Sequence, residues 1–501
     1  MASLAQTNVP SQSDILIGGG GFSGTTIAEK QIDFLIRNRS RMGERKATIA
    51  IVDPSGKYGP GHPYEDRYND RLVLNQPLYC MSPDPADPDL AARWVSDNRH
   101  KLVESGFMSE RDVSALTFDG IRRLFIPRPV YGDFLGQRFQ EACENAVANN
   151  IEISKVQGSL THVHALDDSF VNEIEIEGVP QPISSTVSII ADGHYSNDFL
   201  NELKGKENYY QGKVSLDELG LSLLRYTQGV AIVGSGQDMM DRLAQFNALN
   251  FDHPIHVISR RGVKPWLFDP ALYDPKRKAE EYRLSVFTPE DVRKVSGFAN
   301  LKTLWDSEII KAGQSVARDG LPYGPGHVLA AYFKKIHDFD SDIEGWPEME
   351  SYIQAYYGNP TAPQRMAMLE KYEQTGQLQF HTSAVNAESI KAGDRGYDFT
   401  IALDNGTSLE VDAIFNSAGC ARAAREKGHI HSPLIAALDA KEYIRWDPNN
   451  SGILVPGKQN KPGLYYGGPF AFGGKWGCET FRGVYGEIAQ DSVSYLLDRE
   501  I

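Results

Sequence analysis

The chain has 501 residues, more than one ordinary domain accommodates, so we expect two or three domains with their own cores. Apolar residues make up 41% and charged residues 23%, a balance that excludes a disordered or fibrous chain. The formal net charge of -15 argues against nucleic acid or an anionic membrane as a partner, because both attract a basic surface.

The cysteines and the apolar runs indicate the compartment. The four cysteines lie far apart in the sequence and form neither a CxxC pair nor a metal-ligand cluster, which argues against a thiol reductase and indicates a reducing compartment. His62, His194, His327 and His381 are isolated in the sequence, and no metal site is expected. Residues 1–13 contain no Lys or Arg, and no later apolar run reaches the roughly 20 residues of a membrane span. We therefore expect a cytoplasmic protein.

The first folded unit is predicted near the N-terminus. The apolar run Asp14–Ile17 leads into a glycine-rich segment, Gly18–Gly24, and a helix-like stretch follows to about Asn38. The segment Ala47–Asp53 predicts a second strand, because β-branched residues dominate it and turn residues close it. Strand, helix and strand form a βαβ unit, which implies a parallel sheet.

The glycine-rich segment fits the pattern G-x-G-x-x-G in one register only. The first glycine of this pattern allows a tight turn, the second lets the backbone approach a pyrophosphate, and the third lets the helix pack on the strand. An acidic residue at the end of the next strand suits an adenosine ribose. A glycine turn without a ligand is the alternative, but the strand-turn-helix context favours nucleotide binding. The residues predicted to bind the nucleotide here are Gly19, Gly21, Phe22, Ser23, Gly24 and Asp53.

A second βαβ unit is predicted in the middle of the chain. It consists of Gly229–Gly236, a helical pattern to about Leu249, and the strand-like run Ile255–Arg261. Its motif keeps two glycines but has Met239 at the third position, so the motif by itself is only suggestive. The residues predicted to bind NADPH in this motif are Gly234, Gly236 and Gln237.

The end of the second βαβ unit indicates the choice of nucleotide. The strand ends in Arg260 and Arg261 instead of an acid, and guanidinium groups suit the 2′-phosphate that distinguishes NADPH from NADH. An exposed arginine pair on a loop is the alternative. Asp238 lies where the helix begins, and its carboxylate would repel a pyrophosphate unless the side chain points away.

The remainder of the chain is less regular. Residues 266–371 combine aromatic and charged residues with scattered Pro and Gly, and they predict an inserted helical cap. Strand patterns return at residues 397–403 and 411–415, and a helix from about Gly483 to Asp498 closes the chain. The first domain is expected to be completed by this C-terminal part.

Five segments together resemble the FAD/NAD(P)-binding flavoproteins related to N-hydroxylating and other two-dinucleotide-domain flavin monooxygenases. They are Gly19–Gly24, Leu74–Ser82, Ile126–Leu135, Gly234–Gln237 and Gly467–Pro469. The resemblance implies an α/β fold with two Rossmann-like domains, in which the NADPH domain is nested in a split FAD domain. The predicted boundaries are 1–205 and 419–501 for the FAD domain, 206–265 and 372–418 for the NADPH domain, and 266–371 for the helical insert.

The resemblance also implies further contacts with FAD. The loop from Gly59 to Ser82 would lie along the flavin, and a C-terminal segment would approach its pyrimidine end, where a helix N-terminus stabilises negative charge. The alternatives are that the loop residues only pack within the protein and that Arg128 has a purely structural role. The cofactor-binding residues predicted on this basis are His62, Asn75, Met81, Arg128, Gly468 and Thr480.

The implied reaction is a monooxygenation in which NADPH reduces FAD and a flavin peroxide oxygenates a small substrate with molecular oxygen. N-hydroxylation of an amino acid or other primary amine is the first expectation. Because the cofactor carries the chemistry, no catalytic residue is assigned. An NAD(P)H-dependent flavoprotein reductase without oxygen insertion is the alternative, and a redox-responsive FAD-binding protein is a third hypothesis. A homo-oligomer is compatible with the sequence.

Overall fold

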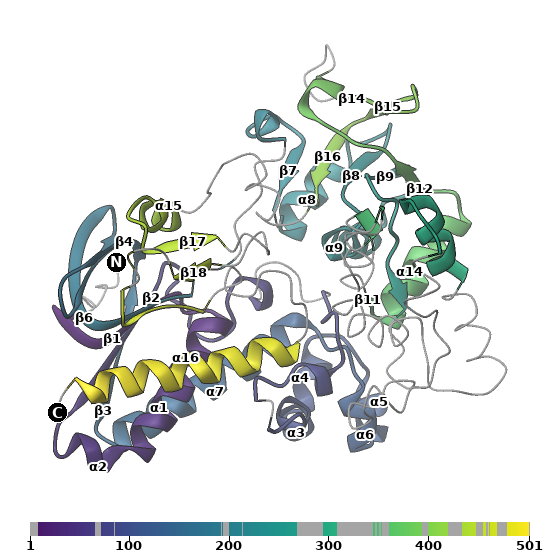
Figure 1. Ribbon diagram of the computed structural model, residues 1–501. Coiled ribbons are helices and arrows are strands. Elements are labelled where there is room, and N and C mark those ends of the chain that lie inside the picture. Colours follow the sequence, from purple (N-terminus) through teal and green to yellow (C-terminus); the bar gives the residue numbers. More distant parts are fainter. Residues whose placement is uncertain are drawn as a thin grey trace, which may run out of the picture.

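The computed structural model describes residues 9–65, 72–84, 86–191, 193, 200–212, 214–267, 294–307, 344–345, 348–349, 352, 360–392, 399–418, 433–446, 454–456, 459, 461–467 and 478–499. Two sheets, one mixed and one parallel, each with helices packed against it, organise these residues (Figure 1). One sheet is built from the N-terminal region and a C-terminal strand, and the other from the middle of the chain.

The first sheet has seven strands in the order β3-β2-β1-β6-β5-β4, and β19 pairs with β6. The neighbours β3, β2, β1 and β6 are parallel, as is β19 with β6, whereas β4, β5 and β6 form an antiparallel meander. The strands are β1 (Gln12–Gly18), β2 (Ala47–Asp53), β3 (Ile151–Gln157), β4 (Ser159–Ala165), β5 (Phe170–Ile176), β6 (Val179–Ile190) and β19 (Leu464–Tyr466).

Both faces of this sheet are buried, which explains the unbroken apolar run in β1. Successive side chains of a strand point to opposite faces, so Ile15 and Ile17 join one core and Leu16 joins another. The first core is covered by three helices, and α16 runs along α1 (Figure 1). These helices are α1 (Phe22–Arg37), α7 (Arg128–Ala148) and α16 (Cys478–Asp498).

The second sheet has five parallel strands in the order β12-β9-β8-β16-β7. Its strands β12, β9, β8 and β16 repeat the order of β3, β2, β1 and β6, so the two halves share one topology. The strands are β7 (Tyr209–Gln211), β8 (Val230–Val233), β9 (Ile255–Ser259), β12 (Leu378–Thr382) and β16 (Ala413–Asn416).

Helices cover one face of the second sheet and a small antiparallel sheet packs on the other. On the helical face, Met240, Leu243 and Phe246 pack with strand residues such as Ile232. The helices are α8 (Leu216–Leu223), α9 (Gln237–Ala248) and α14 (Pro363–Gln374). The small sheet contains β13 (Ile390–Ala392), β14 (Phe399–Ala402) and β15 (Ser408–Val411).

The remaining described elements fill the space around the two sheets. Helices between β2 and α7 share a core with the start of α7, and α15 packs on β4. These elements are α2 (Arg39–Met42), α3 (Leu90–Asp97), α4 (His100–Glu104), α5 (Glu110–Ala115), α6 (Phe118–Arg122), α15 (Pro433–Ala440), β10 (Trp266–Leu267), β11 (Pro360–Thr361), β17 (Ile444–Trp446) and β18 (Leu454–Pro456), with short 3-10 helices at 62–64, 78–80, 201–203 and 387–389.

The predicted fold class is confirmed, because the chain leaves the first sheet after β6, builds the second, and returns as β19. The predicted domain boundaries stay predictions, and α14 spans the one placed at residue 371 while packing on α9. Two helices begin earlier than predicted, α1 at Phe22 and α16 at Cys478. Strands β3 to β5 were not predicted individually, because their half-exposed positions accept polar residues and weaken the apolar signal.

None of the helices formed by the described residues is long and apolar enough to cross a membrane. No group of three or more His, Cys, Asp or Glu side chains in the same residues is arranged to hold a metal ion.

Two histidines contact each other on neighbouring strands of the second sheet. His256 Nδ1 lies 3.1 Å from His381 Nε2 across β9 and β12. Burial lowers the pKa of both imidazoles, and the charge of His381 lowers that of His256 further. Because the unfolded histidines then bind protons more readily, the free energy of unfolding should fall as the pH drops below the unfolded pKa of about 6.5. We expect His381→Gln to reduce this loss, measured as the urea midpoint at pH 7.5 and 5.5. The matched control is His253→Gln, on the loop before β9, and an equal pH dependence in both variants would contradict the assignment.

Candidate dinucleotide-binding sites

The first glycine loop lies between β1 and β6, where the strand order of the sheet reverses. Gly19 has a φ of +121°, and its N–H donates to the Val52 carbonyl at 2.8 Å. A Cβ on Gly19 would lie 2.3 Å from the Ala191 carbonyl oxygen, so only glycine fits between β1 and the end of β6. The turn thus opens at the carboxyl edge of the parallel strands, where ligands of such sheets bind.

The other two glycines bring helix α1 against this turn. A Cβ on Gly24 would lie 1.9 Å from the Gly19 carbonyl oxygen, so the third glycine allows close packing of the helix. Gly21 is the N-cap of α1 without a side-chain cap, and a Cβ there would lie 3.1 Å from the Cα of Gly61. The N–H groups of the first turn therefore face no capping side chain of their own and suit an anion.

Asp53 holds the glycine loop in place. Its Oδ2 accepts the Gly20 N–H at 2.8 Å, and its Oδ1 accepts the backbone N–H and the hydroxyl of Ser55. The ring of Tyr58 lies where a Gly20 side chain would be, and its buried hydroxyl has no hydrogen-bond partner among the described residues. Contact of Asp53 with a ribose stays a prediction. The uncapped helix, the glycine cradle and the unpartnered hydroxyl fit a nucleotide.

Phe22 and Ser23 connect this loop to the C-terminal helix. The Ser23 hydroxyl lies 2.7 Å from the Tyr485 hydroxyl, and the Phe22 ring packs edge-on against the Tyr485 ring with centroids 6.0 Å apart. Burial raises the pKa of Tyr485, so it stays a neutral phenol. The sequence gives no local signal for Tyr485, because more than 460 residues separate it from Ser23.

The predicted flavin-side residues lie on two loops beside the first sheet. His62 is exposed in the 3-10 helix that follows Gly61. Asn75 Oδ1 accepts from Arg128, and the Met81 carbonyl accepts from the Tyr131 hydroxyl. Contact of these residues with FAD stays a prediction.

The two remaining flavin-side residues lie near the C-terminus. Gly468 lies outside the described residues, and Thr480 lies in the first turn of α16. The prediction that a helix N-terminus approaches the flavin therefore rests on α16, and no described contact tests it.

The second glycine loop repeats the geometry of the first. Gly234 has a φ of +111°, its N–H donates to the Ile258 carbonyl at 2.8 Å, and a Cβ would lie 2.2 Å from the Ser417 carbonyl oxygen. Gly236 is the N-cap of α9 without a side-chain cap, and a Cβ there would meet no described atom within 4 Å. Gln237 begins α9. The third position, Met239, is buried in the core of the second domain and not at the turn.

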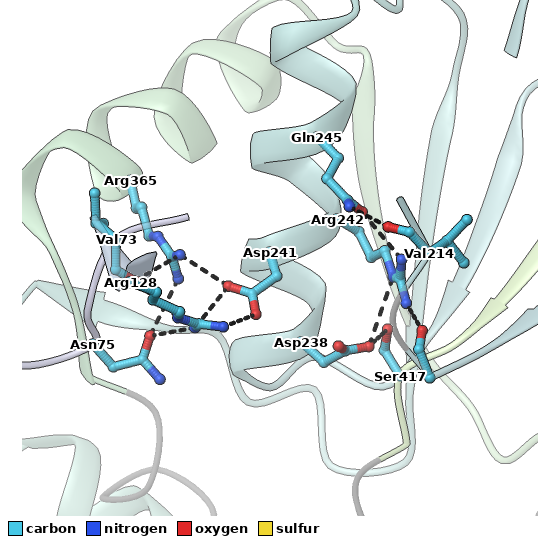
Figure 2. Close-up of polar contacts among 11 residues, drawn as sticks. Val73, Asn75, Arg128, Val214, Asp238, Asp241, Arg242, Gln245, Arg365 and Ser417 are labelled. Atoms are coloured by element: carbon cyan, nitrogen blue, oxygen red, sulfur yellow. Dashed lines mark hydrogen bonds and ion pairs between the residues drawn. The ribbon is translucent and has the colours of Figure 1, made fainter. Parts of the chain in front are cut away.

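Asp238 does not face the open side of this loop. Its carboxylate accepts from the Ser417 hydroxyl and lies 3.8 Å from the Arg242 guanidinium (Figure 2). The sequence predicted that the Asp238 carboxylate would repel a pyrophosphate unless its side chain points away. This repulsion is reduced, because the carboxylate faces the Arg242 guanidinium.

The arginine pair follows directly on the second strand. The Ser235 hydroxyl donates to Ser259 at 3.0 Å, so Ser259 takes the place that Asp53 has in the first domain. Arg260 and Arg261 come next and are exposed. Both side chains lie exposed at this edge of the sheet, and their contact with a 2′-phosphate stays a prediction.

Two residues without a sequence signal, Asp241 and Arg365, join the two domains through the predicted residue Arg128. Arg128 on α7 donates to both oxygens of Asp241 on α9, at 2.8 and 3.0 Å, and Arg365 on α14 lies 2.9 Å from the same carboxylate (Figure 2). All three side chains are buried. These contacts engage Arg128 within the protein, so its predicted contact with a cofactor stays a prediction. No motif marks Asp241 or Arg365, because their partners lie more than 100 residues away.

The fold and the two glycine loops define a protein with two dinucleotide-binding domains. A sequence model of a FAD-NAD(P)-binding family matches residues 16–194, which include the first glycine loop. A comparison with curated protein sequences finds no match.

Solved structures share the fold over nearly the whole chain. Ornithine hydroxylase from Pseudomonas aeruginosa in its reduced form has a TM-score of 0.53 at 11% identity, covering 98% of this chain and 100% of that one. An ornithine N-hydroxylase from Kutzneria sp. 744, solved with reduced FAD, NADP+ and L-ornithine, has a TM-score of 0.51 at 13% identity, with the same coverage. The chain has the fold of the two-dinucleotide-domain flavoproteins, as the resemblance predicted, and the family match at residues 16–194 supports FAD and NAD(P) as its cofactor class.

The two equivalent N-caps predict separable losses of cofactor. We expect Gly21→Val to yield folded but colourless protein, because the side chain would occupy the space that a pyrophosphate needs beside α1. Gly236→Val is the matched variant and should keep FAD while weakening NADPH binding. Visible absorbance of the purified proteins measures FAD, and circular dichroism checks folding. Stoichiometric FAD in folded Gly21→Val protein would refute the assignment of the first loop.

Proposed function

We propose that the protein is a FAD-dependent, NADPH-consuming monooxygenase that N-hydroxylates an amino acid or another small primary amine. The observation that carries the proposal is the pair of glycine loops with the same geometry in one chain, each at the reversal point of its sheet. The shared fold with ornithine hydroxylases supports the choice of reaction.

The first domain supplies the binding site for FAD. Gly19, Gly21 and Gly24 let the backbone and the N-terminus of α1 approach the pyrophosphate, and Asp53 keeps the loop in that shape. Bound FAD would supply the redox and oxygen chemistry. The chain needs only to orient the substrate and to exclude water, so the absence of an assigned acid or base is consistent with the proposal.

The second domain supplies the binding site for NADPH. The N-terminus of α9 would face the pyrophosphate at Gly236 and Gln237, with the Asp238 carboxylate directed toward Ser417. Arg260 and Arg261 would bind the 2′-phosphate, since guanidinium groups form charge-assisted hydrogen bonds to phosphate oxygens.

Oxygen and NADPH consumption test the proposal directly. The purified protein is mixed with NADPH and with ornithine, lysine or a simple primary amine, and oxygen uptake is compared with the amount of hydroxylated product. The expected result is substrate-dependent uptake matched by product. Electron transfer to an acceptor without oxygen, and no oxygenated product, would establish the reductase instead. NADPH consumption below detection with every substrate would favour a redox-responsive binding protein.

The arginine pair predicts the nucleotide preference. Each charge-assisted contact with the 2′-phosphate contributes on the order of 1.5–3 kcal/mol, about tenfold or more in affinity. We therefore expect the double variant Arg260→Ala/Arg261→Ala to lose most of its preference for NADPH over NADH, measured as the ratio of the two kcat/KM values. Arg225→Ala is the matched control, because Arg225 is exposed and precedes β8 at the opposite edge of the sheet. An unchanged ratio in the double variant would place the phosphate site elsewhere.

A further inference from the structure

Helix α9 is fixed to its own domain along one side. The Arg242 guanidinium donates to the Gly212 carbonyl and to Gln245, whose amide donates to the Val214 carbonyl at 2.7 Å. Figure 2 shows these side chains on the side of the helix opposite to Asp241. With Asp238 bound to Ser417, contacts over two turns hold α9 against the segments before α8 and after β16. The helix and its glycine loop therefore form one rigid unit.

On its opposite side, α9 contacts the first domain through the Asp241 carboxylate. Asp241 is 8% exposed and lies between the guanidinium groups of Arg128 and Arg365, which are 8% and 3% exposed. Arg128 binds it with two nitrogens, a geometry that fixes orientation as well as distance. Asp241 lies one turn of helix beyond Gln237, at the end of α9 that carries the glycine loop.

The same two arginines hold the loop on the flavin side. Arg128 and Arg365 each donate to the Val73 carbonyl, at 3.2 and 3.0 Å, and each lies 3.2 Å from Asn75 Oδ1. Val73 and Asn75 are thus bonded both to Arg128 on α7 of the first domain and to Arg365 on α14, and Val73 also packs against Ala362 at the start of α14. The loop that contains Asn75 and the helix that carries Asp241 therefore bind the same two arginine side chains (Figure 2).

Asp241, Arg128 and Arg365 form the joint between the two domains. In this joint the two guanidinium groups share one carboxylate, and the charge of Asp241 holds the two arginines together. Burial lowers the pKa of Arg365 to about 10, which leaves it charged at neutral pH. Without the carboxylate, two like charges would face each other in a buried site where the acceptors described for them are the neutral oxygens of Val73 and Asn75. Loss of either arginine, in contrast, would leave a balanced pair.

We infer that Asp241 is a positioning residue that couples the orientation of the second dinucleotide-binding loop to the flavin-side loop at Val73–Asn75. The kinetic part of this inference rests on the proposed function, whereas the structural part does not. The coupling needs no movement of Asp241 itself, because α9 is rigid and the arginines reach both elements.

Hydrogen exchange tests the structural part on the purified full-length protein. The Leu74 N–H donates to Ile126 and the Arg128 N–H to Leu72, so peptides covering 72–78 and 126–131 report on the loop. We expect Asp241→Asn to speed exchange there at least tenfold, with β2 peptides unchanged. Arg365→Met restores a balance of one cation to one anion and should change exchange far less. The double variant Asp241→Asn/Arg365→Met should recover part of the protection, since it removes one of the two opposing cations.

Flavin reduction by NADPH tests the kinetic part without oxygen. In Asp241→Asn the limiting rate at saturating NADPH should fall at least tenfold while FAD content stays unchanged, and the double variant should regain part of that rate. A merely structural role would lower FAD content and protection throughout the chain and would show no recovery in the double variant.

The outcomes separate the two proposals. Unchanged exchange at 72–78 in Asp241→Asn, or a double variant no better than Asp241→Asn, would overturn the inference. Failure of NADPH to reduce the flavin of the unaltered protein would overturn the proposed function instead. The exchange results would still test whether Asp241 couples the two loops.

Discussion

Two positions that accept only glycine determine the shape of both dinucleotide-binding turns. At Gly19 and at Gly234 the backbone passes so close to the carbonyl of the neighbouring crossover strand that a Cβ would overlap it, at 2.3 and 2.2 Å. This contact closes each turn on the carboxyl edge of its sheet and directs the following helix away from the strand with its first N–H groups uncapped. The open turns and uncapped helix N-termini that suit a dinucleotide follow from that approach.

The same turn is stabilised differently in the two domains. In the first, the Asp53 carboxylate accepts the Gly20 N–H, and in the second, the hydroxyls of Ser235 and Ser259 bond to each other. The replacement of an acid by a serine removes a negative charge from the rim of the second site. Together with the exposed Arg260 and Arg261, it makes that rim more favourable for a ligand with an additional phosphate.

The joint between the domains serves orientation more than stability. Burying ions is costly, and breaking a buried pair typically costs about 3–5 kcal/mol because the remaining charge is left uncompensated. A carboxylate shared by two arginines therefore favours a single arrangement of α9 against α7 and α14. An apolar contact of equal size would tolerate sliding, whereas bidentate hydrogen bonds do not.

The sequence by itself determined the local elements of the sites. The glycine pattern, the buried strands before and after it, and the arginines that replace an acid are local signals, because each depends on the backbone conformation or residue chemistry of a few neighbouring positions. Only the tertiary structure decided the rest. Tyr485 meets Ser23, Asp238 turns to Ser417, and Asp241 pairs with Arg128 and Arg365 across segments far apart in the chain. No local pattern encodes such contacts, since they exist only after the two sheets have formed and brought their helices together.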